Sequence, residues 1–436
     1  MFYTCHLSKT EGAKTVMNTD PIIIIGGGQA AVQLCLALRK EKVTTPILVL
    51  SEEGEYPYHR PPLSKSFLSG ETSEEKLLMR PESFYSSKDV DVKLNTRVDQ
   101  IDPENHTVKS AGGDFSYQKL VITTGSRARP LPSAITGADA QFAGVHMIRT
   151  LQQSKHLKQE LADAENIVII GAGFIGLEFA AVANKMGKSV TVYDQADRVM
   201  ARAVSPNIST WFSQQHQSNG IEIQLKDSVS EIIGPNKVSE VVTVSGKRQP
   251  CDLLVAGIGV IANDEIASAA GLKCDDGIVV NEYCETSVAD IYAAGDCAKH
   301  PNSFANNPDI SSGNNMIRLE SIQNATDQAR VIAACIAGKR SEYSSVPWFW
   351  SDQGEYSLQI AGLSNASDTF IERGNPDENS FSVFHYRGTG LQCVDSVNSP
   401  KDHMVARKLI SSGISPTVEQ SGDSSFELKT LLTAPK

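Results

Sequence analysis

The feature that most constrains this chain of 436 residues is an apolar run that ends in a glycine turn, and it occurs twice. In one copy, residues 167–176 read IVIIGAGFIG, and residues 177–183 have the composition of a helix. A strand, a GxGxxG turn and a helix in this order are typical of a dinucleotide site. Gly171 is expected to make the tight turn, Gly173 to let the backbone approach a pyrophosphate, and Gly176 to let the helix pack on the strand.

The other copy lies near the N-terminus, where residues 22–31 read IIIIGGGQAA, a GxGxxA form of the same turn. We expect a helix over residues 30–40 and a strand over residues 47–50. An acidic residue follows the next strand of each copy, Glu52 in the first and Asp194 in the second, where a carboxylate can bind an adenosine ribose. A glycine turn alone is often only a connection, but two full copies with downstream acids indicate two dinucleotide sites.

Composition excludes several other classes of protein. The net charge of −11 argues against nucleic acid or an anionic membrane as the main partner. No apolar run approaches the roughly 18 residues of a membrane span. The eight cysteines are scattered without a CxxC pair or zinc spacing, which predicts reduced thiols, a cytoplasmic protein and no metal site. Residues 1–19 are expected to form a flexible extension, with Met17 as an alternative start.

Other segments place functional groups near the same sites. Residues 119–126 and 252–260 each form an apolar strand that ends in glycine. Asp296 follows Gly295 at another strand end, where a carboxylate can accept hydrogen bonds from a sugar alcohol, although aspartate is also a common helix N-cap. In residues 56–65 the paired prolines forbid a helix, so the cations of this loop are held on a stiff backbone.

Together these segments resemble the NADH-dependent ferredoxin reductases of bacterial oxygenase systems, of the putidaredoxin reductase and biphenyl dioxygenase ferredoxin reductase type. The resemblance extends over about residues 21–409, and its most specific segments are RPPLSK at 60–65 and WFWSDQ at 348–353. It implies a glutathione-reductase-like α/β fold with two Rossmann-like FAD/NAD(P)-binding domains and a C-terminal α+β domain.

The resemblance also implies domain boundaries. Residues 20–145 and 262–340 would form a discontinuous FAD-binding domain, and residues 146–261 would form the NADH-binding domain inserted in it. Residues 341–436 would form the C-terminal reductase domain, in which Trp348 is expected to be a packing residue.

The same resemblance implies the residues that bind the two cofactors. The positions matching FAD contacts are Gly26, Gly28, Ala30, Ala31, Glu52, Arg60, Lys65, Val98, Thr124, Gly125, Arg149, Asp296, Glu320, Ser321 and Ile322. The positions matching NADH contacts are Gly173, Phe174, Ile175, Glu178, Asp194, Arg198, Arg202 and Gly257.

Three side chains are expected to take part in electron transfer. Lys65 and Glu178 would form a charge pair near the reacting nitrogen of the flavin, and Trp350 would form the lip of the electron exit route. Asp194 favours NADH over NADPH because its carboxylate repels a 2′-phosphate. Arg198 argues the other way, since an arginine can bind that phosphate.

The expected activity is that of an FAD-containing ferredoxin–NAD(+) reductase, a monomer or homodimer. Its partner would be a [2Fe-2S] ferredoxin of Rieske or plant type that feeds a Rieske-type or cytochrome P450 oxygenase. Alternatives are an NADH:rubredoxin reductase, an apoptosis-inducing-factor-like flavoprotein, and a disulfide or peroxide reductase of the same fold. The last needs a redox cysteine beside the flavin, but Cys35 stands alone on its helix and residues 56–65 contain none.

Overall fold

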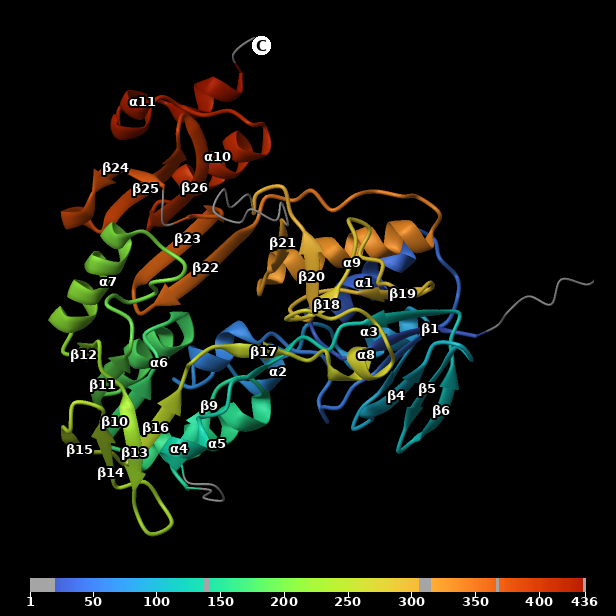
Figure 1. Ribbon diagram of the computed structural model, residues 1–436, viewed down its shortest axis with the longest axis horizontal. Helices are drawn as coiled ribbons and strands as arrows, with labels where there is room; N and C mark the ends of the chain where they lie inside the picture. Colours follow the sequence, from blue (N-terminus) through green and yellow to red (C-terminus); the bar gives the residue numbers. More distant parts are fainter. Residues whose placement is uncertain (1–19, 137–141, 306–314, 366–367, 434–436) are drawn as a thin grey trace, which may run out of the picture.

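The elements of this computed structural model gather into three parts, which we call the first unit, the second unit and the C-terminal domain (Figure 1). The structure describes residues 20–136, 142–305, 315–365 and 368–433. The predicted N-terminal extension, residues 1–19, lies outside the described residues. No helix among the described residues is long and apolar enough to cross a lipid bilayer.

The first unit is built on a five-stranded parallel sheet in the order β19-β7-β1-β2-β3. Its central strand β1 consists of four buried isoleucines, as expected for a parallel strand covered on both faces. Helix α1 follows the first glycine turn and packs against α9. The bounds are β1 Ile22–Ile25, α1 Gln29–Lys40, β2 Ile47–Leu50, β3 Val90–Lys93, β7 Lys119–Ile122, β19 Ile291–Ala293 and α9 Ile322–Ile336.

Short elements around this sheet complete the first unit. The expectation that the paired prolines forbid a helix in residues 56–65 is wrong for its second half, where a 3-10 helix, η1 (Pro61–Ser64), begins at the prolines themselves. Proline is tolerated in the first turn of a helix because an N–H there would have no partner within the helix. Two small sheets flank the main one, β4-β5-β6 and β18-β20-β21. The remaining bounds are α2 Glu74–Leu77, α3 Glu82–Ser87, β4 Val98–Asp102, β5 Thr107–Ser110, β6 Gly113–Ser116, α8 Glu265–Ala269, β18 Ile278–Val279, β20 Ala298–Pro301 and β21 Met316–Arg318.

The second unit repeats the design with a parallel sheet in the order β12-β11-β10-β16-β9. Its central strand β10 leads through the second glycine turn into α6. The bounds are β9 Val145–Met147, α5 Leu151–Asp163, β10 Asn166–Ile170, α6 Phe174–Lys185, β11 Ser189–Asp194, α7 Pro206–Ser218, β12 Glu222–Leu225 and β16 Leu253–Ala256. A three-stranded antiparallel sheet is added, with β13 Val229–Ile233, β14 Glu240–Thr243 and β15 Arg248–Pro250.

An antiparallel ribbon carries the chain between the two units. Strand β8 (Ser126–Ala128) leaves the first unit and pairs with β17 (Val260–Ala262), which returns to it. Helix α4 (Ser133–Thr136) and the side chains of Leu131 and Phe142 already pack on the core of the second unit. Two adjacent strands, β8 and β17, therefore connect the second unit to the first.

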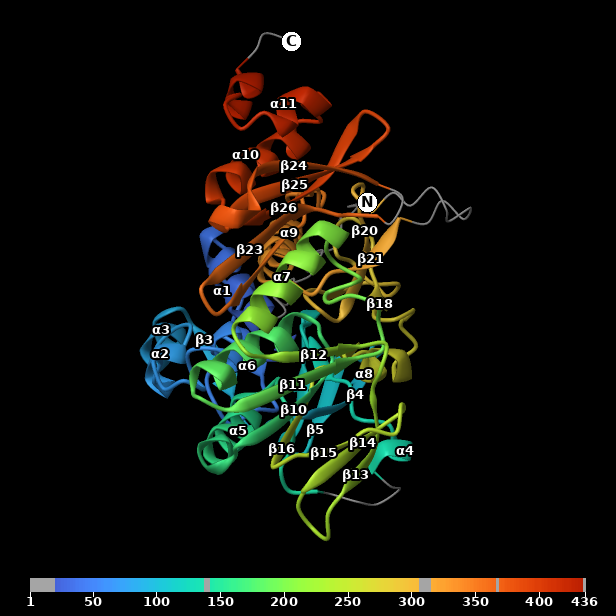
Figure 2. The same ribbon diagram turned by 90° about the vertical axis from the view of Figure 1, so that its left-hand side faces the viewer.

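The C-terminal domain is an antiparallel sheet in the order β22-β23-β26-β25-β24. One face shares a core with the second unit, where Phe381 and Val383 pack with Trp211 and Phe212 of α7, and Figure 2 shows α7 beside this sheet. Helix α10 covers the other face. The bounds are β22 Trp348–Gln353, β23 Tyr356–Gly362, β24 Thr369–Asn375, η2 Pro376–Glu378, β25 Ser380–Arg387, β26 Gly390–Val397, α10 Pro400–Ser411, α11 Val418–Gly422 and η3 Leu428–Leu432.

The predicted fold class is confirmed: two α/β units with parallel sheets are followed by an α+β domain. The predicted helix over residues 30–40 starts one residue earlier, at Gln29. The predicted domain boundary between residues 145 and 146 falls inside β9, which pairs with β16 of the second sheet. Strand β9 pairs with a strand more than a hundred residues later in the chain, a partner that no local pattern indicates.

Candidate functional site

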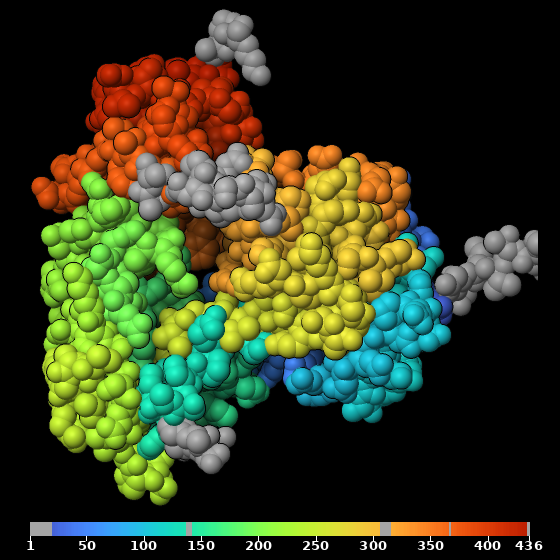
Figure 3. Space-filling view, viewed as in Figure 1, coloured from blue at the N-terminus to red at the C-terminus, as the bar shows by residue number. Residues whose placement is uncertain are grey.

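A large cavity lies where the three parts meet, and the space-filling view shows the molecule hollowed there (Figure 3). Its volume is about 1030 Å³. Most of the predicted site residues line it, from segments far apart in the chain. They are Gly26, Gly28, Ala30, Glu52, Arg60, Lys65, Val98, Thr124, Gly125, Arg149, Ile175, Glu178, Asp296, Glu320, Ser321, Ile322 and Trp350.

The other predicted residues lie outside the cavity wall. Ala31 is buried in the core beneath α1. The remainder lie at or after the carboxyl ends of β10, β11 and β16, the edge at which parallel sheets bind ligands. These residues are Gly173, Phe174, Asp194, Arg198, Arg202 and Gly257.

The two glycine turns have the same geometry. Gly26 and Gly171 have φ of +105° and +107°, and a Cβ on either would lie 2.5 or 2.4 Å from a carbonyl oxygen of the neighbouring strand end. Only glycine tolerates this turn. By contrast, a Cβ on Gly28 or Gly173, the N-caps of α1 and α6, would meet nothing within 4 Å. The space beside each helix N-terminus is therefore open for the backbone approach of a diphosphate.

Lys65 and Glu178 form the predicted charge pair. The distance between Lys65 Nζ and Glu178 Oε1 is 2.8 Å, although Lys65 directly follows η1 of the first unit and Glu178 lies on α6 of the second. The Glu178 side chain is 3% exposed, whereas that of Lys65 is 19% exposed toward the cavity. The pair is therefore a buried carboxylate that fixes an ammonium at the cavity wall.

Sequence reasoning missed the other partners of this carboxylate. Ser64 Oγ donates to Glu178 Oε2 at 2.7 Å, and Ser351 Oγ of β22 donates to Glu178 Oε1 at 2.7 Å. Both serines lie inside the two segments, RPPLSK and WFWSDQ, that are the most specific of the sequence. Their place in these two segments was the only indication in the sequence that these serines belong to the site.

A second polar cluster joins strand ends of the first unit. Asp296 Oδ2 accepts hydrogen bonds from Ser126 Oγ at 2.8 Å and from the Arg149 guanidinium at 2.8 Å. Arg60 donates to the Arg149 carbonyl at 2.8 Å and forms an ion pair with Glu53. Ser126 and Glu53, which were not among the predicted site residues, also line the cavity. Asp296 is thus a fixed carboxylate at the cavity wall, not a helix N-cap.

Asp194 and Arg198 make contacts that bear on the choice of nucleotide. The Asp194 carboxylate accepts from the backbone N–H of Ala172 at 2.6 Å and of Ala196 at 2.8 Å, so it is anchored to the glycine turn. The Arg198 guanidinium donates to the carbonyls of Ala201 and Val204 and to the Ser209 hydroxyl. These donors are directed toward its own loop and the first turn of α7, and not toward the glycine turn.

Aromatic rings connect the cavity wall to α10. Trp350 lines the cavity, and its ring centroid lies 5.6 Å from that of Trp348. The Arg407 guanidinium lies 4.5 Å from the Trp348 centroid, and His403 contacts the same ring edge-on. Trp348, half-buried, is therefore packed, as expected, but between the cavity and a cation of α10.

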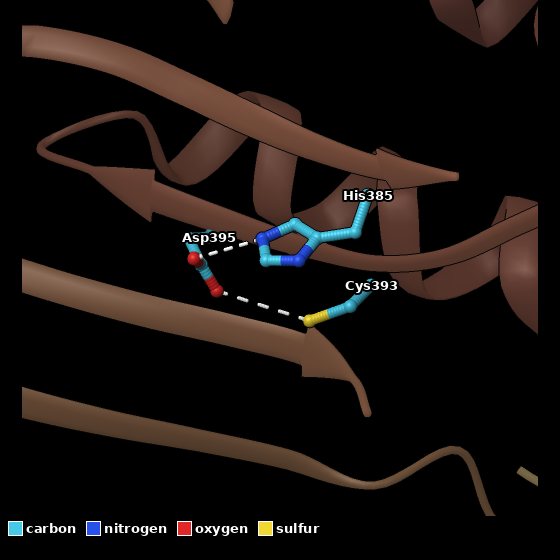
Figure 4. Close-up of side chains that lie close together, drawn as sticks. All are labelled: His385, Cys393 and Asp395. Carbon is cyan, nitrogen blue, oxygen red and sulfur yellow. Dashed lines mark hydrogen bonds and ion pairs between the residues drawn. The ribbon is translucent and has the colours of Figure 1, made fainter. Parts of the chain in front are cut away.

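One group in the described residues brings three metal-binding types of side chain together: His385, Cys393 and Asp395 (Figure 4). All three are fully buried, and His385 Nε2 lies 2.9 Å from Asp395 Oδ2. The same oxygen accepts from the backbone N–H of Ser205, the N-cap of α7, at 3.0 Å. The carboxylate is thus already used by protein donors, and it joins the C-terminal sheet to the second unit.

Comparison with known proteins assigns this architecture. The family model for pyridine nucleotide-disulphide oxidoreductases matches residues 20–329, and a model for the reductase C-terminal domain matches residues 348–432. The chain belongs to the pyridine nucleotide-disulphide oxidoreductase family. It is 40% identical over 417 residues to rhodocoxin reductase of Rhodococcus erythropolis, a match that covers 95% of each chain.

Solved structures extend the assignment of this oxidoreductase. The ferredoxin reductase for the CYP199A2 system from Rhodopseudomonas palustris aligns with a TM-score of 0.89 at 40% identity, covering 94% of this chain and 99% of that one. The covalent putidaredoxin reductase–putidaredoxin complex aligns with a TM-score of 0.89 at 35% identity, covering 95% and 98%. These matches confirm the predicted resemblance.

The cysteines distinguish this oxidoreductase from those family members that use a disulfide. No cysteine among the described residues lines the cavity. Cys35, on α1, is packed in the core of the first unit, and burial raises the pKa of its thiol to about 12. A thiol held in its protonated form is a poor nucleophile. The described residues therefore give no support to the disulfide or peroxide reductase alternative.

Proposed function

We propose that this protein is an FAD-dependent NADH:ferredoxin oxidoreductase that accepts hydride from NADH and passes single electrons to a [2Fe-2S] ferredoxin feeding an oxygenase. The observation that carries the proposal is the cavity at the junction of the three parts, with one open glycine turn in each unit and the Lys65–Glu178 pair between them. Full-length similarity to reductases of oxygenase systems supports the choice of acceptor.

The residues of each turn suit one of the two cofactors. FAD would lie along the first unit, with its diphosphate at Gly28 and the N-terminus of α1, and with Asp296 at the sugar-alcohol chain. NADH would enter by Gly173 and the N-terminus of α6. When bound, the flavin supplies the conversion from two-electron to one-electron transfer. All of the predicted cofactor contacts stay predictions, both those that line the cavity and those that lie away from it, such as Ala31 and Arg202.

The protein's own groups would position and stabilise the reacting atoms. The Lys65 ammonium faces the cavity and would stabilise negative charge that develops there, because a fixed cation in a site shielded from water is effective. Glu178 holds the ammonium in place. Trp350 and Trp348 would cover the exit side, where Arg407 offers a positive group to an acidic partner. We place this activity in the cytoplasm, where NADH is available.

The test of the activity is reconstitution with purified components. FAD-loaded protein should reduce cytochrome c with NADH only when a [2Fe-2S] ferredoxin is added. A panel of plant-type and Rieske-type ferredoxins and a rubredoxin should give the highest rate with a ferredoxin. A preference for rubredoxin would support the rubredoxin reductase alternative. An NADH-reduced flavin that transfers electrons to none of them would favour the apoptosis-inducing-factor-like alternative.

Asp194 predicts a preference for NADH over NADPH. Its anchored carboxylate can accept hydrogen bonds from both ribose hydroxyls and would repel a 2′-phosphate, while the Arg198 donors are used elsewhere. Charged hydrogen bonds of about 1.5–3 kcal/mol correspond to a kcat/KM for NADH roughly 10- to 100-fold above that for NADPH. Asp194→Asn should lower the ratio of the two kcat/KM values to near one.

The control for this prediction is Asp197→Asn, which changes an exposed acid of the same loop. It should leave the ratio unchanged. A kcat/KM with NADPH that equals or exceeds that with NADH in the unmodified protein would contradict the assignment of Asp194.

A further inference from the structure

The Glu178 carboxylate contacts side chains from the other two parts of the molecule. Lys65 and Ser64 come from the first unit and Ser351 from β22 of the C-terminal domain, while Glu178 itself lies on α6 of the second unit. Ser64 and Ser351 are 2% and 0% exposed. A buried carboxylate is costly unless its oxygens are all supplied with donors, and this one is supplied at both.

The hydrogen bonds behind Ser351 have a fixed direction. An ionised carboxylate can only accept, so the Ser351 hydroxyl must donate to Glu178 and can itself accept only at its lone pairs. Gln353 Nε2 lies 3.3 Å from Ser351 Oγ, which makes the amide the donor there. The Gln353 carbonyl then faces His216 Nε2 at 2.8 Å.

His216 is the origin of this chain of donors. It is buried on α7, and burial lowers the pKa of its imidazole. Because the Gln353 carbonyl oxygen can only accept, His216 Nε2 must donate the hydrogen bond between them. Three successive hydrogen bonds, from His216, Gln353 and Ser351, therefore all point at the carboxylate. Hydrogen bonds in such a chain polarise and strengthen one another.

We propose that Ser351 is a positioning residue for hydride transfer, through which the C-terminal domain fixes the Glu178 carboxylate and hence the Lys65 ammonium. This inference rests on the proposed NADH-dependent reduction of a bound flavin. With one oxygen bonded to Ser64 and the other to Ser351, the plane of the carboxylate is set, and the direction of its contact with Lys65 follows. Without Ser351 the carboxylate can rotate and the ammonium moves with it.

The test is a double-mutant cycle with Ser351→Ala and Glu178→Gln in FAD-loaded, full-length protein. Anaerobic stopped-flow mixing with NADH gives the limiting rate constant of flavin reduction and the apparent Kd for NADH. Ser351→Ala alone should lower the rate constant about 10-fold, because small displacements of a reacting group are costly, with Kd and FAD content unchanged. In the Glu178→Gln background the charged carboxylate that holds the Lys65 ammonium is already absent, so Ser351→Ala should change the rate constant by less than about twofold.

Two further variants make the cycle decisive. Ser357→Ala removes a hydroxyl from the neighbouring strand β23 that donates to Asp352 outside the cavity lining, and it should leave the rate constant unchanged. Ser351→Cys keeps a side chain of similar shape but offers only a weak hydrogen-bond donor, so it should slow flavin reduction to a similar extent. It therefore provides the measurement should the alanine variant lose FAD.

The outcomes separate the inference from the function on which it rests. An unchanged rate constant in both Ser351 variants would overturn the inference. So would an equal loss with and without the Glu178→Gln substitution, which would mean that Ser351 acts independently of the carboxylate. If NADH fails to reduce the flavin of the unmodified protein, the proposed function itself fails, whatever the variants do.

Discussion

Replacement of Lys65 by methionine is expected to slow reduction of the bound flavin by NADH about 100-fold, the typical effect of removing one preorganised charged group from a reaction site. Methionine has a similar length but no charge. The Lys65 ammonium lies 2.8 Å from Glu178 and faces the cavity, so its loss removes the only cation that the buried carboxylate contacts in the described structure. FAD should stay bound because the first glycine turn is unaltered.

Stopped-flow reduction and the FAD-to-protein ratio measure the two halves of this prediction. Lys299→Met is a matched control, since Lys299 is 18% exposed and pairs with Asp275 at 2.7 Å, but does not line the cavity. It should reduce at the unmodified rate. An unchanged rate in Lys65→Met would remove Lys65 from the mechanism, and loss of FAD would make it a structural residue.

Gly176→Ala is expected to destabilise the protein by about 3 kcal/mol, at the upper end of the cost of overpacking a rigid site. A Cβ at this position would lie 2.0 Å from the Gly171 carbonyl oxygen, and a backbone atom cannot rotate away as a side chain can. Helix α6 must move outward instead, and Glu178 lies two residues further along it. NADH-dependent reduction should therefore fall together with stability.

Gly173→Ala is the matched comparison within the same turn. Its φ is −82°, and an added Cβ would meet no atom within 4 Å, so the unfolding midpoint should stay unchanged. Because the methyl group would occupy the space that we assign to a diphosphate, the apparent Kd for NADH should rise about 10-fold, a cost of about 1.4 kcal/mol. Thermal unfolding and NADH titration of both variants check these results. Equal loss of stability in both would contradict the distinction between a packing glycine and a ligand glycine.

The local parts of the site could be predicted from sequence because each is contained in a short segment. A strand, a glycine turn and a helix require fixed residues at fixed spacing. The two turns could therefore be identified from sequence, together with Gly171 as the residue of the tight turn and Gly176 as the residue where the helix packs on the strand. The Lys65–Glu178 pair joins residues far apart in the chain, and only the family resemblance linked its members; the structure then placed them in contact.

The rest depends on three-dimensional packing that no local pattern encodes. Ser351 meets Glu178 across 173 positions of the chain, and a serine in a strand has no sequence signal for its partner. Arg198 is a residue type that often binds phosphate, but its guanidinium donates to backbone carbonyls of its own loop. The pairing of β9 with β16 similarly depends on a strand more than a hundred residues later in the chain, which no local pattern around β9 indicates.

The meeting of three parts at one carboxylate limits how freely reductases of this kind can exchange modules. A chimera that takes its C-terminal domain from another relative would present a different side chain to Glu178 unless the residue at position 351 is retained. The same holds for a graft of the second unit, which brings its own α6 and α7. Successful recombination should therefore transfer Ser64, Glu178, Ser351 and the supporting pair Gln353 and His216 as one inherited set.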